Sequence, residues 1–124
     1  MAPDVLRTFP YTSECPMHNS FTERDWKYMR SLKDELLHAL CERINRQAVV
    51  IVESEKGDPH ERYAKLYEHV LASGKIVAKC FDEWRRSKLW MKVLALRNHG
   101  LLSEEQIQNL SESARECLAR IPAE

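Results

Sequence analysis

Residues 58–84, DPHERYAKLYEHVLASGKIVAKCFDEW, constrain the fold more than any other part of the chain. Asp58 is placed to cap a helix, Pro59 fits the first helical position, and Glu61 completes a capping box. An apolar stripe follows at three- and four-residue steps. It consists of Tyr63, Leu66, Tyr67, Val70, Gly74, Val77, Phe81 and Trp84. Because Gly74 removes the side chain from this stripe, it favours the close approach of another helix.

A second long helix is predicted before this segment. Thr22 is a suitable N-cap, and Glu23 and Asp25 complement the helix dipole in the first turn. Apolar residues then recur at helical spacing up to about residue 53: Met29, Leu32, Leu36, Leu40, Ile44, Ala48 and Ile51. The β-branched run AVVIV (48–52) would also suit a strand, but the chain offers no partner strand, so a helix is favoured. Such a helix spans roughly 45 Å, too long for a small globule to cover.

The C-terminal part predicts two shorter helices joined as a hairpin. We expect a break near 85–87, a helix over 88–97 that is closed by Asn98-His99-Gly100, and a last helix over 103–121 with Ser103 as its cap. The fold class is therefore all-α with four helices, two of them long, and a C-terminal helical hairpin. Residues 1–21, with prolines at 3, 10 and 16, are expected to form a flexible arm, and 22–124 a single all-helical domain.

Composition limits the possible partners and compartments. The 124 residues include 19 basic and 19 acidic side chains, so net charge gives no general case for nucleic acid or membrane. No apolar run is long enough for a bilayer span, and the first twenty residues do not resemble a signal peptide. The four cysteines are widely scattered, which is unlike a disulfide framework. We expect a cytoplasmic protein with reduced thiols, in which Cys80 and Cys117 are core residues.

Candidate catalytic and metal-binding groups are incomplete. Cys15 and His18, combined with His38 and Cys41, would supply a zinc ligand set, but neither pair has the spacing of a known zinc motif. Glu35 and His38 match half of a di-iron motif that needs a second copy. No nucleophile elbow or glycine-rich phosphate loop occurs. We therefore predict no enzyme, no metal and no cofactor.

The segment 84–97, WRRSKLWMKVLALR, has five basic residues, two tryptophans and no acid. It would suit RNA, DNA or an acidic helix. The glutamates of the last helix, at 104, 105, 112 and 116, would neutralise it across the hairpin, and this interpretation is favoured because the chain lacks a net basic charge. The alternative function is a small nucleic-acid-binding helical protein that uses Arg85, Arg86, Lys88 and Lys92.

The aromatic residues of the stripe are the best interface candidates. A stripe at helical spacing is commonly ordinary core, but helices this long cannot cover one another fully, and a second copy would bury what is left. For the dimer interface we predict Tyr63, Tyr67, Val70 and Gly74, flanked by the charges of Glu68 and Lys75. For binding of a partner protein we predict Trp84, Arg85, Arg86 and Lys88.

Three segments resemble the fluorescence recovery protein family: 65–71 (KLYEHVL), 81–83 (FDE) and 94–105 (LALRNHGLLSEE). The resemblance implies an elongated, all-helical homodimer with antiparallel long helices. It also implies a non-enzymatic regulator, without cofactor, that binds an orange carotenoid protein and hastens its return to the resting state. Glu68 and Tyr67 would take the places of an interfacial aspartate and histidine. Ala64 and Gly74 stand where the family has tryptophan and arginine, with Lys75 as a substitute, which favours a divergent member with a different partner.

Overall fold

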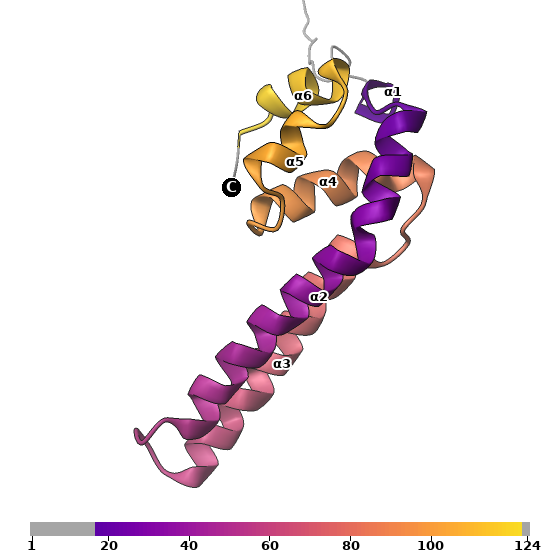
Figure 1. Cartoon of the computed structure of the whole chain (residues 1–124). Coiled ribbons are helices and arrows are strands. Elements are labelled where there is room, and N and C mark those ends of the chain that lie inside the picture. Colours follow the sequence, from indigo (N-terminus) through magenta and orange to yellow (C-terminus); the bar gives the residue numbers. More distant parts are fainter. Residues whose placement is uncertain (1–16, 123–124) are drawn as a thin grey trace, which may run out of the picture. The chain divides into compact units, whose positions relative to one another are not determined.

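The computed structural model describes residues 17–122, and every regular element in that range is helical (Figure 1). The all-α prediction is confirmed. In chain order the elements are α1 (Met17–Ser20), α2 (Glu23–Glu53), α3 (Pro59–Phe81), the 3-10 turn η1 (Arg86–Lys88), α4 (Leu89–Asn98), α5 (Glu104–Gln108) and α6 (Glu112–Ala119). None of these helices combines the length and apolarity that a bilayer crossing requires. The arm expected over 1–21 lies mostly outside the described residues, and its last part includes α1.

The chain divides into two compact units. The hairpin unit is Leu32–Glu83, and the terminal unit combines the described parts of Met1–Ser31 and Trp84–Glu124. Helix α2 contributes its first turns to the terminal unit and the rest to the hairpin unit. Helix α2, with 31 residues, is longer than one small core can cover. Its first turns therefore pack in the terminal unit, and the rest packs in the hairpin unit.

The hairpin unit consists of α2 and α3 running antiparallel side by side (Figure 1). The predicted start of α3 is confirmed: Glu61 donates its backbone N–H to Asp58 Oδ1 at 2.8 Å, and Asp58 donates to Glu61 Oε1 at 2.8 Å. Gly57, at φ 77°, provides the left-handed turn that leads into this capping box. The helices are tied midway by His69, whose Nε2 donates to the backbone oxygen of Ile44 at 3.0 Å.

The terminal unit packs the small helices around the start of α2. Helix α1 lies against α4 and α6. The buried apolar residues of this unit are Phe21, Met29, Leu89, Val93, Ala95, Leu96, Leu101, Leu102, Leu110, Ala114, Cys117 and Leu118. Helix α4 ends at Asn98 and is closed as predicted by Gly100, after which the Leu101 N–H donates to Leu96 O at 2.9 Å in a Schellman arrangement. Cys117 of this unit and Cys80 of the hairpin unit are both buried, which confirms them as core residues.

The last predicted helix, over 103–121, is divided into α5 and α6. Ser103 caps α5 with Gln106 in a capping box, as expected. A new cap then forms at Ser111, whose side chain accepts from the Ala114 N–H at 3.3 Å. The break lets Leu110 reach the core, where it is buried. The same break presents the Ser111 backbone N–H and hydroxyl to Asp25 of α2.

The end of α3 also differs from the prediction. Its stripe was expected to continue to Trp84, but the helix ends at Phe81 and Asp82 is its C-cap. Glu83 follows with φ 53°, a left-handed conformation that turns the chain away from the helix. Trp84 therefore belongs to the connection before η1 and to the terminal unit.

Candidate interaction surfaces

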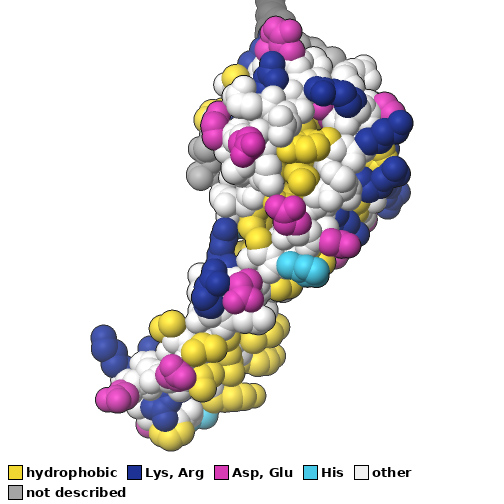
Figure 2. Space-filling model, viewed as in Figure 1, with side chains coloured by type: hydrophobic (Ala, Val, Ile, Leu, Met, Phe, Trp, Pro, Cys, Tyr) yellow, Lys and Arg dark blue, Asp and Glu magenta, His cyan; other side chains and the backbone are white. Residues whose placement is uncertain are grey.

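The hairpin unit exposes a large apolar surface. In Figure 2 hydrophobic side chains cover much of the visible part of this hairpin. The exposed large apolar residues of α2 and α3 are Val49, Val50, Val52, Tyr63, Tyr67, Val70 and Leu71, and we call this set the hairpin face. Each is between 51% and 69% exposed in the single chain. Soluble monomers rarely leave so many large apolar side chains together in water, so the hairpin face is the main candidate interaction surface.

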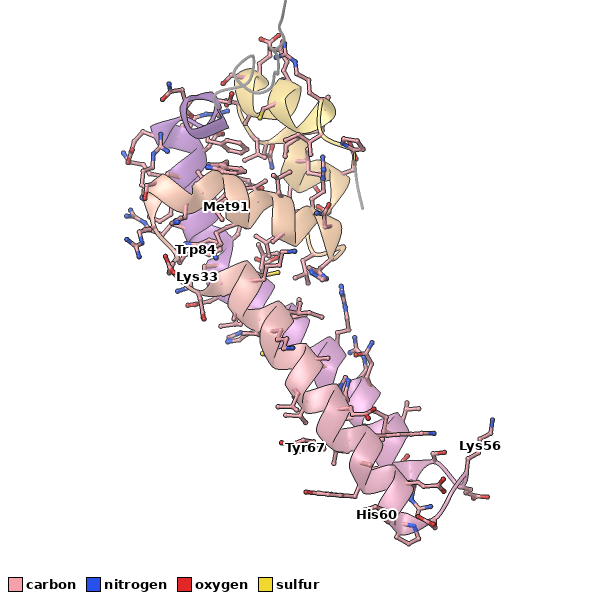
Figure 3. All side chains as sticks on the ribbon, turned by 180° about the vertical axis from the view of Figure 1, so that it is seen from behind. Lys33, Lys56, His60, Tyr67, Trp84 and Met91 are labelled. Carbon is pink, nitrogen blue, oxygen red and sulfur yellow. The ribbon has the colours of Figure 1, made fainter. Side chains whose placement is uncertain are left out.

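The hairpin face arises because α3 has two apolar lines and only one packs on α2. The packed line runs through Leu66, His69, Ser73 and Cys80, which are half-buried or buried. The exposed line contains Tyr67, Val70 and Gly74, each directly after a packed residue. One residue corresponds to about 100° around a helix, so the exposed line points well away from α2. In Figure 3 Tyr67 points outward from the hairpin.

The two tyrosines at the centre of the face are ordered against each other. The ring centroids of Tyr63 and Tyr67 are 6.4 Å apart with planes inclined at 29°. Stacking within the chain reduces the rotamer freedom that docking would otherwise remove. The pair therefore presents a preorganised aromatic surface.

The predicted dimer-interface residues lie together on the outer side of α3. Tyr63, Tyr67, Val70 and Gly74 are exposed, as are the flanking Glu68 and Lys75. A Cβ at Gly74 would meet nothing within 4 Å, so the single chain gives no packing reason for this glycine. Phe81, by contrast, is only 6% exposed and belongs to the core.

The valines of α2 were missed as interface candidates. The run 48–52 was considered only as a choice between helix and strand. In the helix, Ala48 and Ile51 are half-buried, whereas Val49, Val50 and Val52 are exposed. β-Branched residues are weak helix formers, so three of them on an exposed helical surface indicate a packing role. That signal was present in the sequence.

The basic segment 84–97 is largely used within the terminal unit. Arg86 donates Nη2 to the Phe21 carbonyl at 2.6 Å and lies 3.4 Å from Glu23. Lys92 is 7% exposed.

Arg97 donates to the carbonyls of Leu118 and Ile121, both at 2.8 Å. Arg97 thus donates to carbonyls in and just after α6, whereas neutralisation by the glutamates of the last helix was expected. Of the predicted partner-binding residues, Arg85 is exposed, Lys88 and Trp84 are half-buried, and Arg86 is held by the start of α2.

A shallow hollow of about 230 Å³ lies in the terminal unit. Its lining residues are Arg97, Glu104, Ile107, Gln108, Arg115, Leu118 and Ala119. Both arginines donate to backbone carbonyls, Arg115 to those of Gln108 and Leu110. Because these cations serve the fold, the hollow has no group arranged for chemistry.

The residues considered for metal binding do not converge in the described part of the chain. Within residues 17–122 no three of the His, Cys, Asp and Glu side chains are placed to hold an ion. Cys15 lies outside the described residues, and His38 is exposed on α2.

Comparison with protein-family models, with curated proteins and with solved structures gives no match to this chain. The resemblance to fluorescence recovery proteins thus rests on the three sequence segments alone.

Proposed function

We propose that this chain is a homodimeric, non-enzymatic interaction protein similar to fluorescence recovery proteins, and that the hairpin face is the dimer interface. The observation that carries the proposal is the set of seven large apolar side chains left exposed on α2 and α3. A second copy is the best occupant because the face is apolar on both helices and can therefore bury itself against its own symmetry mate.

The energetic balance supports this occupant. Each of these side chains is already partly covered, so full burial contributes roughly 1 kcal/mol apiece. Seven from each of two copies then supply on the order of 14 kcal/mol, which exceeds most of the roughly 4–15 kcal/mol range for the cost of association. The opposite charges of Glu68 and Lys75 lie on the margin of the tyrosine line, where antiparallel pairing would bring unlike charges together.

In this proposal the dimer serves as a rigid helical surface for a partner protein. By analogy with the family that the sequence resembles, the partner is an orange carotenoid protein or a protein that likewise has two states. Binding that prefers one state shifts the partner's equilibrium without any chemical step. The wholly helical architecture and the engaged arginines of the terminal unit suit such a role.

The oligomeric state is tested by size-exclusion chromatography with light scattering. We expect the wild type at twice the 14.6 kDa of the chain. Tyr63→Glu/Tyr67→Glu should give the mass of a monomer, because it buries charge in the interface. Lys65→Glu/Ala72→Glu changes two exposed residues on the other side of α3 and should stay dimeric. A wild-type mass of 14.6 kDa at high protein concentration would overturn the dimer.

The partner role is tested separately by adding the protein to photoactivated orange carotenoid protein. A faster spectroscopic return to the resting state would support this partner. An unchanged rate in the presence of a confirmed dimer would exclude it and direct the search to other two-state proteins.

A further inference from the structure

The second surface of interest is a basic edge on the terminal unit. The contacts of Arg86 with Phe21 and Glu23 hold η1 beside the first turn of α2. Figure 2 shows Lys and Arg side chains gathered along the margin of this part of the molecule. We define the basic edge as Arg24, Lys27 and Arg30 of α2 with Arg85 and Lys88 around η1.

The two acidic groups in the first turn of α2 are engaged or buried, whereas Asp82 and Glu83, just before Arg85 in the chain, are exposed. Glu23 lies 3.4 Å from Arg86. Asp25 is 1% exposed and accepts hydrogen bonds from Ser111. Among residues 17–122, Arg24, Lys27 and Lys88 form no ion pair with a carboxylate. The first acid further along the same side of α2 is Asp34, beyond Arg30.

The terminal unit carries its exposed acids on other elements. Glu104, Glu105, Glu112 and Glu116 of α5 and α6 are all exposed. The exposed carboxylates of α5 and α6 are thus on other elements than the basic edge, although Arg115 and Arg120 lie beside them in the chain. Such a separation orients an approaching charged partner even when the total charge is balanced.

Apolar groups adjoin the basic edge. Arg30 lies over the Trp26 ring, with its guanidinium carbon 5.8 Å from the ring centroid. Met91 is 42% exposed one turn after Lys88, and Trp84 is half-buried just before η1. Trp84 and Met91 are both labelled in the terminal unit in Figure 3. Charge flanking aromatic and thioether groups is typical of protein interfaces.

We propose that the basic edge binds an acidic segment of a partner protein that also carries an apolar side chain. This inference rests on the proposed role as an interaction protein, but it does not depend on the dimer. An acidic protein segment fits better than a nucleic acid. A duplex carries about one charge per 1.7 Å of its axis and would extend beyond this small edge toward the glutamates of the same unit.

The test measures fluorescence anisotropy of a short labelled peptide in which glutamate pairs alternate with leucine. A single-stranded DNA of equal charge is the competitor probe. The edge variant is Lys27→Gln/Lys88→Gln, which changes one residue on each element of the edge. Its matched control is Lys56→Gln/Lys65→Gln, which removes the same charge from exposed positions of the hairpin unit.

We expect salt-sensitive peptide binding that weakens about tenfold in the edge variant and is unchanged in the control. Far-UV circular dichroism and the solution mass should be the same for all three proteins, so a lost dimer and a lost basic edge are told apart. Absence of peptide binding, equal weakening in both variants, or tighter binding of the DNA would each overturn the proposal.

Discussion

Asp25 and Ser111, 86 residues apart in sequence, form the closest polar connection between α2 and the C-terminal helices. Asp25 Oδ1 accepts the Ser111 backbone N–H at 2.7 Å, and Oδ2 accepts the Ser111 hydroxyl at 2.6 Å. Oδ2 also accepts the Thr22 N–H at 2.9 Å, while the Thr22 hydroxyl accepts the Asp25 N–H at 3.1 Å. One buried carboxylate thus caps α2 and fixes the start of α6.

Asp25→Ala should destabilise the terminal unit by about 2 kcal/mol, because it leaves the partly buried N–H groups of Ser111 and Thr22 without their acceptor. Trp26, Trp84 and Trp90 all belong to this unit, so tryptophan fluorescence in a urea titration reports its unfolding. A double-mutant cycle with Ser111→Ala should give a non-zero coupling energy. Strictly additive losses would contradict the connection.

Arg97 of α4 holds the C-terminal end of α6 through hydrogen bonds to backbone carbonyls. Replacing it with Met should cost about 2 kcal/mol, because the carbonyls of Leu118 and Ile121 lose a charged donor. Arg97→Lys should recover little, since an ammonium group cannot reproduce the planar fork that serves both oxygens. The same urea titration measures both variants, with the exposed Arg24→Met as control. If Arg97→Lys keeps the wild-type stability, the positive charge alone, and not the planar fork, holds the end of α6.

Helix starts were predictable because their signals are local. Asp58 and Glu61 form the expected capping box, as do Ser103 and Gln106, and α2 spans Glu23–Glu53 as predicted. The end of α3 was not predictable in the same way. Its left-handed residue is Glu83, whereas the usual sign of such a turn is glycine.

The packing face of α3 was only partly predictable. Leu66 and Tyr67 are consecutive apolar residues, so periodicity alone cannot decide which of them faces α2. The choice is made by polar groups on the packed line, where His69 reaches the Ile44 carbonyl and Ser73 lies 3.5 Å from His69 Nδ1. The bond between Asp25 and Ser111 has no local signal at all, because it depends on the tertiary approach of two distant helix starts.

Two substitutions in the turn before α3 should each destabilise the start of that helix. Asp58→Ala removes the bond that the Glu61 N–H donates to Asp58 Oδ1 and should cost about 1 kcal/mol, while the backbone N–H of residue 58 can still donate to Glu61 Oε1. Gly57→Ala should cost at least as much, because φ is 77° and the new Cβ would lie 2.6 Å from Glu61 Oε1. Urea unfolding followed by far-UV circular dichroism measures both, against the exposed Glu55→Ala. An unchanged midpoint for both would show that the turn does not limit helix stability.

Substitutions at Gly74 distinguish a monomeric hairpin from one that is paired in a dimer. In the single chain a Cβ at this position meets nothing within 4 Å, so Gly74→Ala should raise helix stability by about 1 kcal/mol through propensity alone. In the proposed dimer a second helix approaches at this notch, so Gly74→Leu should split or distort the dimer while most helicity remains. Light scattering gives the mass, circular dichroism gives the helicity, and Gly74→Ala is the conservative control. If Gly74→Leu keeps the wild-type dimer mass and stability, the two helices do not cross at this residue.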